Sequence, residues 1–256
     1  MSAIGLDRVT VTLGGHPVVR EVTATVEPGE WVALIGPNGA GKTSLLRAIA
    51  GLLPCEGSVS LHDEPAATLD RRRRARLLAL VPQEPETPPW LTVAEYVLMG
   101  RTPHLGALAR EGASDRTAAW RALVRLDLEP LGERTLGSLS GGERQRAVVA
   151  RALAQEASIV LLDEPTAALD IGHQQQALDL LDDLRSSEGL TLLAAMHDLT
   201  LAAQYADRVL LLDRGRVVAD GPPANVLTEA ALAEHYGASV RVLTVDDRVA
   251  VLPTRR

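Results

Sequence analysis

The residues that could do chemistry form three short strings, and the first is a glycine-rich loop. It reads Gly36-Pro37-Asn38-Gly39-Ala40-Gly41-Lys42-Thr43 and continues into Ser44. Every fixed position of the pattern G-x-x-x-x-G-K-[ST] is occupied, and the apolar run before it and the helical pattern after it disfavour an ordinary turn. Glycines let backbone N–H groups wrap around a phosphate, and the N-terminus of the following helix adds positive potential. We predict that Lys42 reaches the β- and γ-phosphates of a nucleotide and that Thr43 gives its hydroxyl to Mg²⁺.

The second string is Leu161-Leu162-Asp163-Glu164-Pro165, at the end of an apolar run typical of a buried strand. In a parallel sheet the carboxyl ends of the strands gather at one edge, where ligands bind. Asp163 is therefore predicted to hold Mg²⁺ through water, and Glu164 to polarise an attacking water. Acids that merely face solvent at a strand end are the alternative, which the upstream loop disfavours.

The third string, LSGGERQR, runs from Leu139 to Arg146. Ser140 could serve only as the cap of the helix that follows. Gly141 and Gly142, however, leave backbone N–H groups open at a helix N-terminus, which makes a second anion site. The chain then has two predicted anion sites and only one loop that carries a lysine.

This third string, placed behind the glycine-rich loop and before the Asp-Glu strand, resembles the signature motif of the ABC (ATP-binding cassette) family. The resemblance covers nearly the whole chain and implies an ATPase that uses ATP and Mg²⁺. Gln83, in VPQ, matches the glutamine that touches Mg²⁺ and links to a helical subdomain, and Ala168-Leu169-Asp170 matches the D-loop. His197 matches the histidine that contacts the γ-phosphate; without the resemblance it would be interpreted as a strand-end histidine.

The resemblance also implies a head-to-tail homodimer. Each ATP would lie between the two copies. One copy would supply the 36–44 loop for the phosphates and the catalytic residues Lys42, Gln83, Glu164 and His197. The other copy would supply Ser140, Gly141 and Gly142, and Asp170 would also lie near the nucleotide. One departure concerns the first hairpin, where many relatives carry an aromatic residue that stacks on adenine. That position is Leu13 here, so stacking is expected to be weak or replaced by apolar contact.

Alternating strand and helix patterns must position these residues. The expected elements are a hairpin (Leu6–Thr12, Val18–Val26), strands Trp31–Ile35, Ile159–Asp163, Thr191–Met196 and Val209–Asp213, helices Lys42–Ala50, Val93–Met99, Ser114–Leu126, one ending at Gln155, and His173–Ser186, and a terminal hairpin from Ala238. This rhythm predicts an α/β fold with a largely parallel sheet covered on both faces. Together with the resemblance it indicates a P-loop NTPase core with an N-terminal antiparallel hairpin and an inserted helical subdomain. We expect one domain over 1–256, with its core in 1–84 and 151–256 and the helical subdomain, including the signature motif, in 85–150.

Composition narrows the function classes. The net charge of -7 argues against broad nucleic-acid binding, and Arg71–Arg74 with Arg76 is interpreted as a solvated helix face because no aromatics are interleaved. No secretory signal begins the chain, and its apolar stretches are too short to span a bilayer. A role at a membrane would need a partner, so the expected place is peripheral, on the cytoplasmic face of the cell membrane.

A single acidic cassette without a long coiled-coil insert favours a transporter subunit over ABC ATPases of DNA repair or translation. Gly100-Arg101-Thr102-Pro103-His104, LDIGHQQQ (169–176) and the segments around 226–228 and 236–237 resemble the class that imports iron–siderophores, haem and cobalamin. The implied partners are transmembrane permease subunits and, indirectly, a substrate-binding protein. An ATPase not coupled to transport, or an importer of another cargo, remains the alternative. Trp90 and Tyr96 are compatible equally with docking of a partner and with packing inside the helical subdomain.

Overall fold

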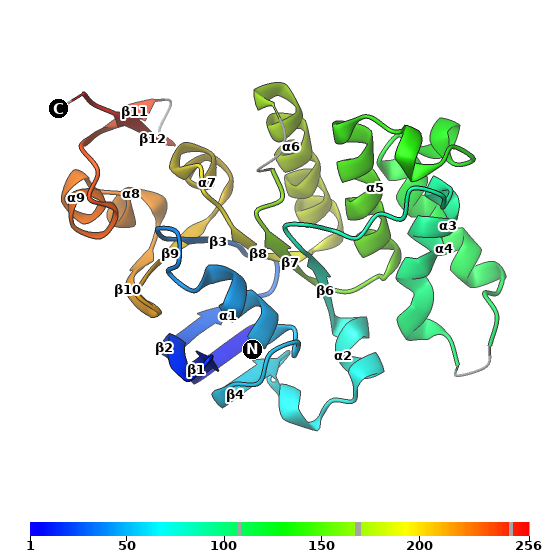
Figure 1. The fold of residues 1–256 in the computed structure, drawn as a ribbon, viewed down its shortest axis with the longest axis horizontal. Coiled ribbons are helices and arrows are strands. Elements are labelled where there is room, and N and C mark those ends of the chain that lie inside the picture. Colours follow the sequence, from blue (N-terminus) through cyan, green and yellow to red (C-terminus); the bar gives the residue numbers. More distant parts are fainter. Residues whose placement is uncertain (107–108, 167–169, 246–247, 256) are drawn as a thin grey trace.

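A six-stranded sheet forms the centre of the fold in the computed structural model, which describes residues 1–106, 109–166, 170–245 and 248–255 (Figure 1). Its neighbours run parallel from β9 to β6, and β10 is antiparallel to β9. In spatial order the strands are β10 (Arg216–Gly221), β9 (Arg208–Asp213), β3 (Trp31–Ile35), β8 (Thr191–Ala195), β7 (Ile159–Asp163) and β6 (Leu78–Val81). The expected mostly parallel sheet is confirmed.

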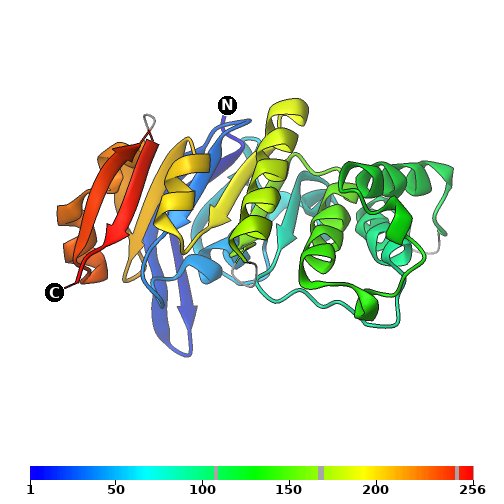
Figure 2. The ribbon, with the colours of Figure 1, turned by 90° about the horizontal axis from the view of Figure 1, so that it is seen from above.

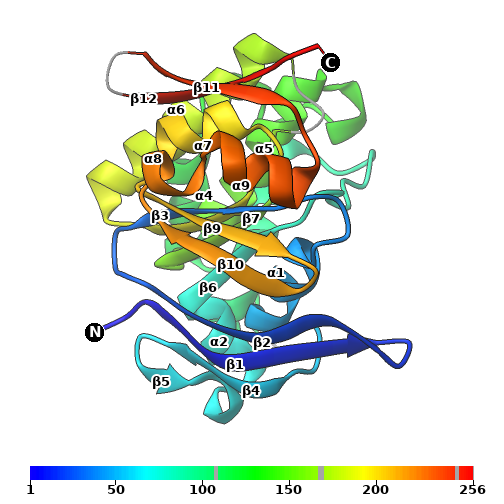
Figure 3. The same ribbon diagram turned by 90° about the vertical axis from the view of Figure 1, so that its left-hand side faces the viewer.

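Both faces of this sheet are covered, which is why its central strands are almost entirely apolar. All five residues of β3 are buried; Trp31, Ala33 and Ile35 belong to one hydrophobic core, and Val32 and Leu34 to the other. The second core also holds α1 (Lys42–Ile49) and a four-stranded antiparallel sheet, so that α1 lies between two sheets (Figure 3). That sheet has the order β2 (His16–Val26), β1 (Ile4–Leu13), β4 (Glu56–Leu61) and β5 (Glu64–Pro65).

Helices cover the opposite face and extend beyond it. Figure 2 shows the green helical segments gathered at one end of the molecule, away from the C-terminal elements. Helices α3, α4 and α5 pack against one another there. The helices are α2 (Arg71–Leu77), α3 (Val93–Leu98), α4 (Ala113–Arg125), α5 (Gly141–Ala154), α6 (Ile171–Glu188), α7 (Leu199–Tyr205), α8 (Pro223–Val226) and α9 (Glu229–Tyr236), with short 3-10 turns η1 (Ala66–Thr68), η2 (Met99–His104), η3 (Glu129–Leu131) and η4 (Leu136–Ser138).

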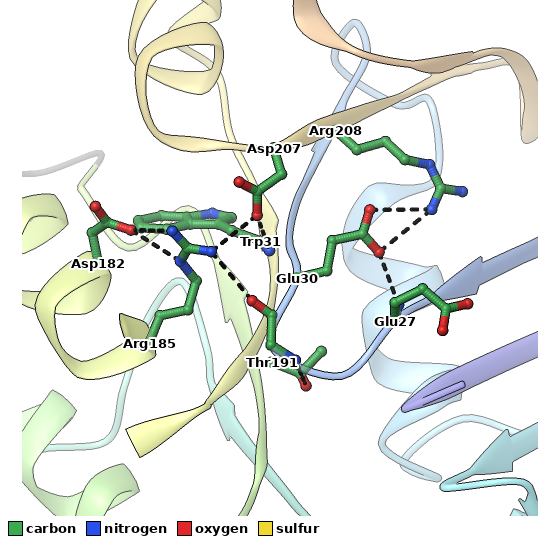
Figure 4. Close-up of polar contacts among 9 residues, drawn as sticks. Glu27, Glu30, Trp31, Asp182, Arg185, Thr191, Asp207 and Arg208 are labelled. Carbon is green, nitrogen blue, oxygen red and sulfur yellow. Dashed lines mark hydrogen bonds and ion pairs between the residues drawn. The ribbon is translucent and has the colours of Figure 1, made fainter. Parts of the chain in front are cut away.

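A polar network fixes the N-terminal end of β3, opposite the end that leads into the glycine-rich loop (Figure 4). The Asp207 carboxylate accepts the backbone N–H of Trp31 at 2.9 Å and Nη1 of Arg185 at 3.1 Å. The same Arg185 nitrogen donates to the carbonyl of Gly29 at 3.2 Å, and its Nε donates to Asp182 at 2.9 Å. Side chains from α6 and from Asp207, just before β9, thereby hold the strand that carries the loop.

The observed elements differ from the expected ones where local pattern is weak. Strands β4, β6 and β10 were not predicted: β6 has only four residues and follows α2 with no turn between them, and β4 and β10 mix polar and apolar residues. Helix α6 begins at Ile171 rather than His173, because Asp170 caps it. The terminal hairpin, β11 (Val240–Val245) with β12 (Arg248–Pro253), is confirmed. Among the described residues no helix is both long and apolar enough to cross a bilayer.

Candidate nucleotide site

The glycine-rich loop connects β3 to α1, and the neighbouring backbone leaves no room for side chains at two of its glycines. Gly36 has φ +151°, and a Cβ there would lie 2.1 Å from the carbonyl oxygen of Leu212. Gly41 has φ +104°, and its Cβ would lie 2.5 Å from the carbonyl oxygen of Val18. Both positions combine a left-handed backbone with close approach of another strand, which only glycine tolerates.

The ammonium group of Lys42 lies inside this loop. Its Nζ donates to the carbonyl of Gly36 at 2.7 Å and to that of Pro37 at 3.4 Å, and the residue is 5% exposed. Burial lowers the pKa of Lys42, while the carboxylates of Glu164 and Asp163 act in the opposite direction. A positive charge is thus held at the centre of a ring of backbone groups, where a phosphate can be bound.

Oxygen ligands for a divalent cation meet beside the loop. The hydroxyl of Thr43, at the start of α1, donates to the carboxylate of Asp163, at the end of β7, at 3.0 Å. Asp163 is 2% exposed, and this burial raises its pKa. A hydroxyl, a carboxylate and the nearby amide of Gln83 fit Mg²⁺, which prefers oxygen ligands and completes its shell with water and substrate phosphates.

Two side chains from distant parts of the chain, Gln83 and His197, converge at Glu164. Gln83 Nε2 donates to one carboxylate oxygen of Glu164 at 2.6 Å, and Nε2 of His197 contacts the other. Glu164 has φ +54°, and its backbone N–H donates to the carbonyl of Ala195 at 3.1 Å. A non-glycine residue in the left-handed region is costly and is often found at functional sites. A cavity of about 470 Å³ is lined by Val18, 38–44, Gln83, Glu164 and His197.

The string LSGGERQR begins α5 and does not line this cavity. Ser140 is the cap: its hydroxyl accepts the N–H of Glu143 at 3.3 Å, and the Glu143 carboxylate accepts the N–H of Ser140 at 2.8 Å. At Gly141 a Cβ would meet no atom of the described residues within 4 Å, so none of them requires glycine there. Gly142 instead packs against the ring of His173.

The two remaining sequence candidates also lie outside the cavity lining. Asp170 caps α6 by accepting the N–H of His173 at 3.0 Å, whereas 168–169 of the same motif lie outside the described residues. Leu13 is 40% exposed at the end of β1, where it pairs with His16. Val18, on the next strand, does line the cavity and was not singled out from the sequence, because an isolated strand valine gives no signal.

Trp90 and Tyr96 have the same two interpretations from the sequence, but Trp90 is exposed to solvent and Tyr96 is buried. Trp90 is 74% exposed, and Tyr96 is 1% exposed. Tyr96 belongs to the main hydrophobic core, and the guanidinium of Arg151 lies 5.0 Å from its ring centroid. Packing is therefore the right interpretation for Tyr96, and its interpretation as an exposed anchor is wrong.

The segment Gly100–His104, which the sequence analysis associates with the importer class, makes hydrogen bonds to other segments of the same chain. Arg101 is 6% exposed; its Nε donates to Asp115 at 3.1 Å and its Nη1 to the carbonyl of Ala154 at 2.7 Å. His104 Nε2 lies 2.9 Å from the carbonyl oxygen of Gln155. These contacts hold the C-terminal end of α5, so the segment positions the helix that starts with the signature string.

Comparison with known proteins agrees with this geometry. The family model described as ABC transporter matches residues 19–167. The chain is 38% identical to the ferric enterobactin transport ATP-binding protein FepC of Escherichia coli (strain K12), over 96% of this chain and 91% of that protein. It is 40% identical to the hemin import ATP-binding protein HmuV of Rhodococcus jostii (strain RHA1), over 97% and 85%. Among solved structures, a dimeric bacterial ABC transporter cassette is similar with a TM-score of 0.76 and 30% identity, over 86% of this chain and 98% of that one.

Proposed function

We propose, because this chain belongs to the ABC transporter family and is one of its ATP-hydrolysing subunits, that it powers uptake of a metal chelate through a separate membrane permease. The relatives include ATP-binding proteins named for ferric enterobactin, hemin, siderophore and cobalamin transport. All four cargoes are metal chelates, and each of these relatives is 38–42% identical to this chain. This agreement across four relatives carries the proposal.

The positions of the site residues support the roles that we propose for them. Lys42 and the backbone of the 36–44 loop would bind the β- and γ-phosphates, and Thr43, Asp163 and Gln83 would hold Mg²⁺, whose charge would offset that of the phosphates. Glu164 is the proposed general base: its carboxylate lies at the cavity and is oriented by Gln83 and His197. His197 would then contact the γ-phosphate side of the nucleotide.

The working form is proposed to be a head-to-tail homodimer. In a single chain the cavity lining includes none of Ser140, Gly141 and Gly142, although the first of these caps a helix N-terminus suited to an anion. The open space at Gly141 would let a phosphate from outside the chain approach the backbone. A second copy turned by half a revolution would supply that phosphate, and Asp170 would lie near the same interface. The dimeric cassette among the similar structures supports this arrangement.

The proposed permease contact is a groove directly after Gln83. It has a volume of about 590 Å³ and is lined by Leu52, Leu53, Pro82, Glu84, Pro85 and Arg151 among others. Apolar rims with a few charges suit a short helix of a membrane partner. The aromatic residue that lines this groove is Tyr96, which is 1% exposed. Trp90, seven residues after Gln83 in the chain and 74% exposed, does not line it and is proposed as a separate aromatic contact for the permease. The subunit would then sit peripherally on the cytoplasmic face of the membrane, and a substrate-binding protein would contact the other side of the permease.

Deletion of the gene tests the cargo class. The deletion strain should lose growth on a ferric chelate or haem as sole iron source, or lose cobalamin-dependent growth, and the wild-type gene should restore it. Restoration should fail with the Glu164→Gln variant. If the strain grows normally on these chelates and fails instead on a sugar or amino acid, the cargo proposal is wrong while the ATPase assignment stands. Growth without any uptake defect would favour the alternative, an ATPase not coupled to transport.

A further inference from the structure

His173, at the start of α6, connects two segments that the cavity does not include. Its ring Nδ1 lies 2.8 Å from Oδ1 of Asp170, and its backbone N–H donates to the same oxygen at 3.0 Å. The His173 N–H groups, the backbone one first, hold the pKa of the Asp170 carboxyl below its usual range. An ionised carboxylate only accepts hydrogen bonds, so Nδ1 carries the proton of this contact.

The same ring covers Gly142 of the signature string. A Cβ at Gly142 would lie 2.7 Å from Cδ2 and 3.2 Å from Nε2 of His173. A contact below 3.0 Å would force the ring to move, so the ring occupies the space that a Cβ at Gly142 would need. Gly142 lies in α5 rather than in a left-handed turn, so its backbone conformation does not demand glycine, whereas the place of the His173 ring favours it.

Two further hydrogen bonds connect the same helices to the segment after the proposed general base. Gln145 Nε2, on α5, donates to the carbonyl of Pro165 at 2.7 Å. Gln174 Nε2, on α6, donates to the carbonyl of Thr166 at 3.1 Å. The signature helix and α6 thus both contact the residues that follow Glu164. His173, which is 47% exposed, adds a direct contact between α6 and Gly142 of the signature helix.

The contact contributes little to the stability of the fold. The side chains of His173 and Asp170 are 47% and 70% exposed. Exposed ion pairs are screened by water and contribute little to folding. Removing the ring should therefore change the relative placement of its two neighbours without unfolding the chain.

We propose that His173 is a positioning residue that couples Asp170 to the signature string within one subunit. The proposal rests on the head-to-tail dimer proposed above, in which both segments face the partner copy. Closure around ATP would then require them to move together. His173 does not touch the nucleotide in this scheme; it acts through Gly142 and Asp170.

Three variants of the homodimer separate the two contacts. His173→Ala removes both; His173→Asn keeps an amide N–H near the position of Nδ1 but loses the ring; His173→Phe keeps a ring but loses the donor. If both contacts are needed, each variant should lower kcat of the complete transporter by roughly 10- to 100-fold, as displaced catalytic groups do. The KM for ATP and the unfolding midpoint should stay unchanged, which a merely structural role would not give.

Gln175→Ala is the matched control, because Gln175 is also exposed on α6. It should leave kcat unchanged. The proposal is overturned if His173→Ala retains kcat within twofold of wild type, or if the Asn or the Phe variant alone retains it.

Complexes with two differently tagged subunits test the direction of the coupling. The reference complex has one Lys42→Ala subunit and one wild-type subunit, so its single intact loop uses the signature string of the Lys42→Ala copy. Adding His173→Ala to the Lys42→Ala copy should slow this complex, and adding it to the other copy should have a smaller effect. Equal effects would refute the coupling to Gly142. If the reference complex is inactive, a head-to-tail dimer with one intact site does not hydrolyse ATP. The homodimer variants then still decide the role of His173.

Discussion

Replacement of Tyr96 by alanine should destabilise the protein strongly, and replacement of Trp90 should not. Tyr96 is 1% exposed, lies in the main core and has the Arg151 guanidinium 5.0 Å from its ring centroid. Truncation of a buried aromatic side chain to alanine costs about 3–5 kcal/mol in comparable cores. For a chain of this size each kcal/mol lowers Tm by about 2–4 °C, so Tm should fall by roughly 6–20 °C.

Trp90 is 74% exposed, so Trp90→Ala should change the free energy of unfolding by no more than about 0.5 kcal/mol. If Trp90 anchors the permease, its loss should weaken the complex by about 2 kcal/mol or more, which is roughly 30-fold in Kd. Tyr96→Phe is the control for the core position, because it keeps the ring and removes only a hydroxyl that accepts from Arg151 at 3.4 Å.

Urea unfolding of the isolated subunit and co-purification with the permease measure the two effects. Tyr96→Ala should lower the unfolding midpoint strongly. Tyr96→Phe should lower the free energy of unfolding by at most about 1 kcal/mol, and Trp90→Ala should affect only co-purification. A Tyr96→Ala variant that stays within 1 kcal/mol of wild type, on the order of a surface substitution, would refute the argument from burial. Normal co-purification of Trp90→Ala would remove Trp90 from the docking surface.

Three further outcomes are expected. Glu164→Gln should lower kcat by about 10²- to 10⁴-fold while ATP binding, measured by titration, persists and the ATP-loaded dimer accumulates; near-normal turnover would exclude Glu164 as the base. Ser140→Arg should block hydrolysis but leave ATP binding by the isolated subunit intact, and mixing it with Lys42→Ala subunits should restore some activity, since one composite site then carries neither change; loss of binding by the isolated variant would contradict the role toward the partner. Leu13→Tyr should tighten ATP binding by up to about 1–3 kcal/mol if the new ring stacks on adenine, whereas an unchanged Kd would show that position 13 does not contact the base.

Local sequence determined the parts of this protein that depend on near neighbours. The loop from Gly36 to Thr43 could be recognised because its function needs small residues and a lysine at fixed spacing. The buried strand ending in Asp163 was predicted to the residue, since a parallel strand covered on both faces forms a near-continuous apolar run, here 159–162 before Asp163. Ser140 was likewise predictable as a cap, because capping involves residues three positions apart.

The tertiary structure alone decided which distant side chains meet and which similar side chains differ in burial. Gln83 and His197 both contact Glu164 although they are 114 positions apart in the chain, and no local pattern encodes that meeting; only the family resemblance suggested it. Trp90 and Tyr96 have similar chemistry in sequence, yet one faces solvent and the other fills the core beside Arg151. Arg101 could not be predicted as buried, because a charged side chain enters a core only when a carboxylate and a helix-end carbonyl from other segments are there to pair with it. The contact of the His173 ring with Gly142 could not be predicted for the same reason, because it depends on how α5 and α6 pack against each other. Spacing along the chain determines only which residues share a face of one helix or strand.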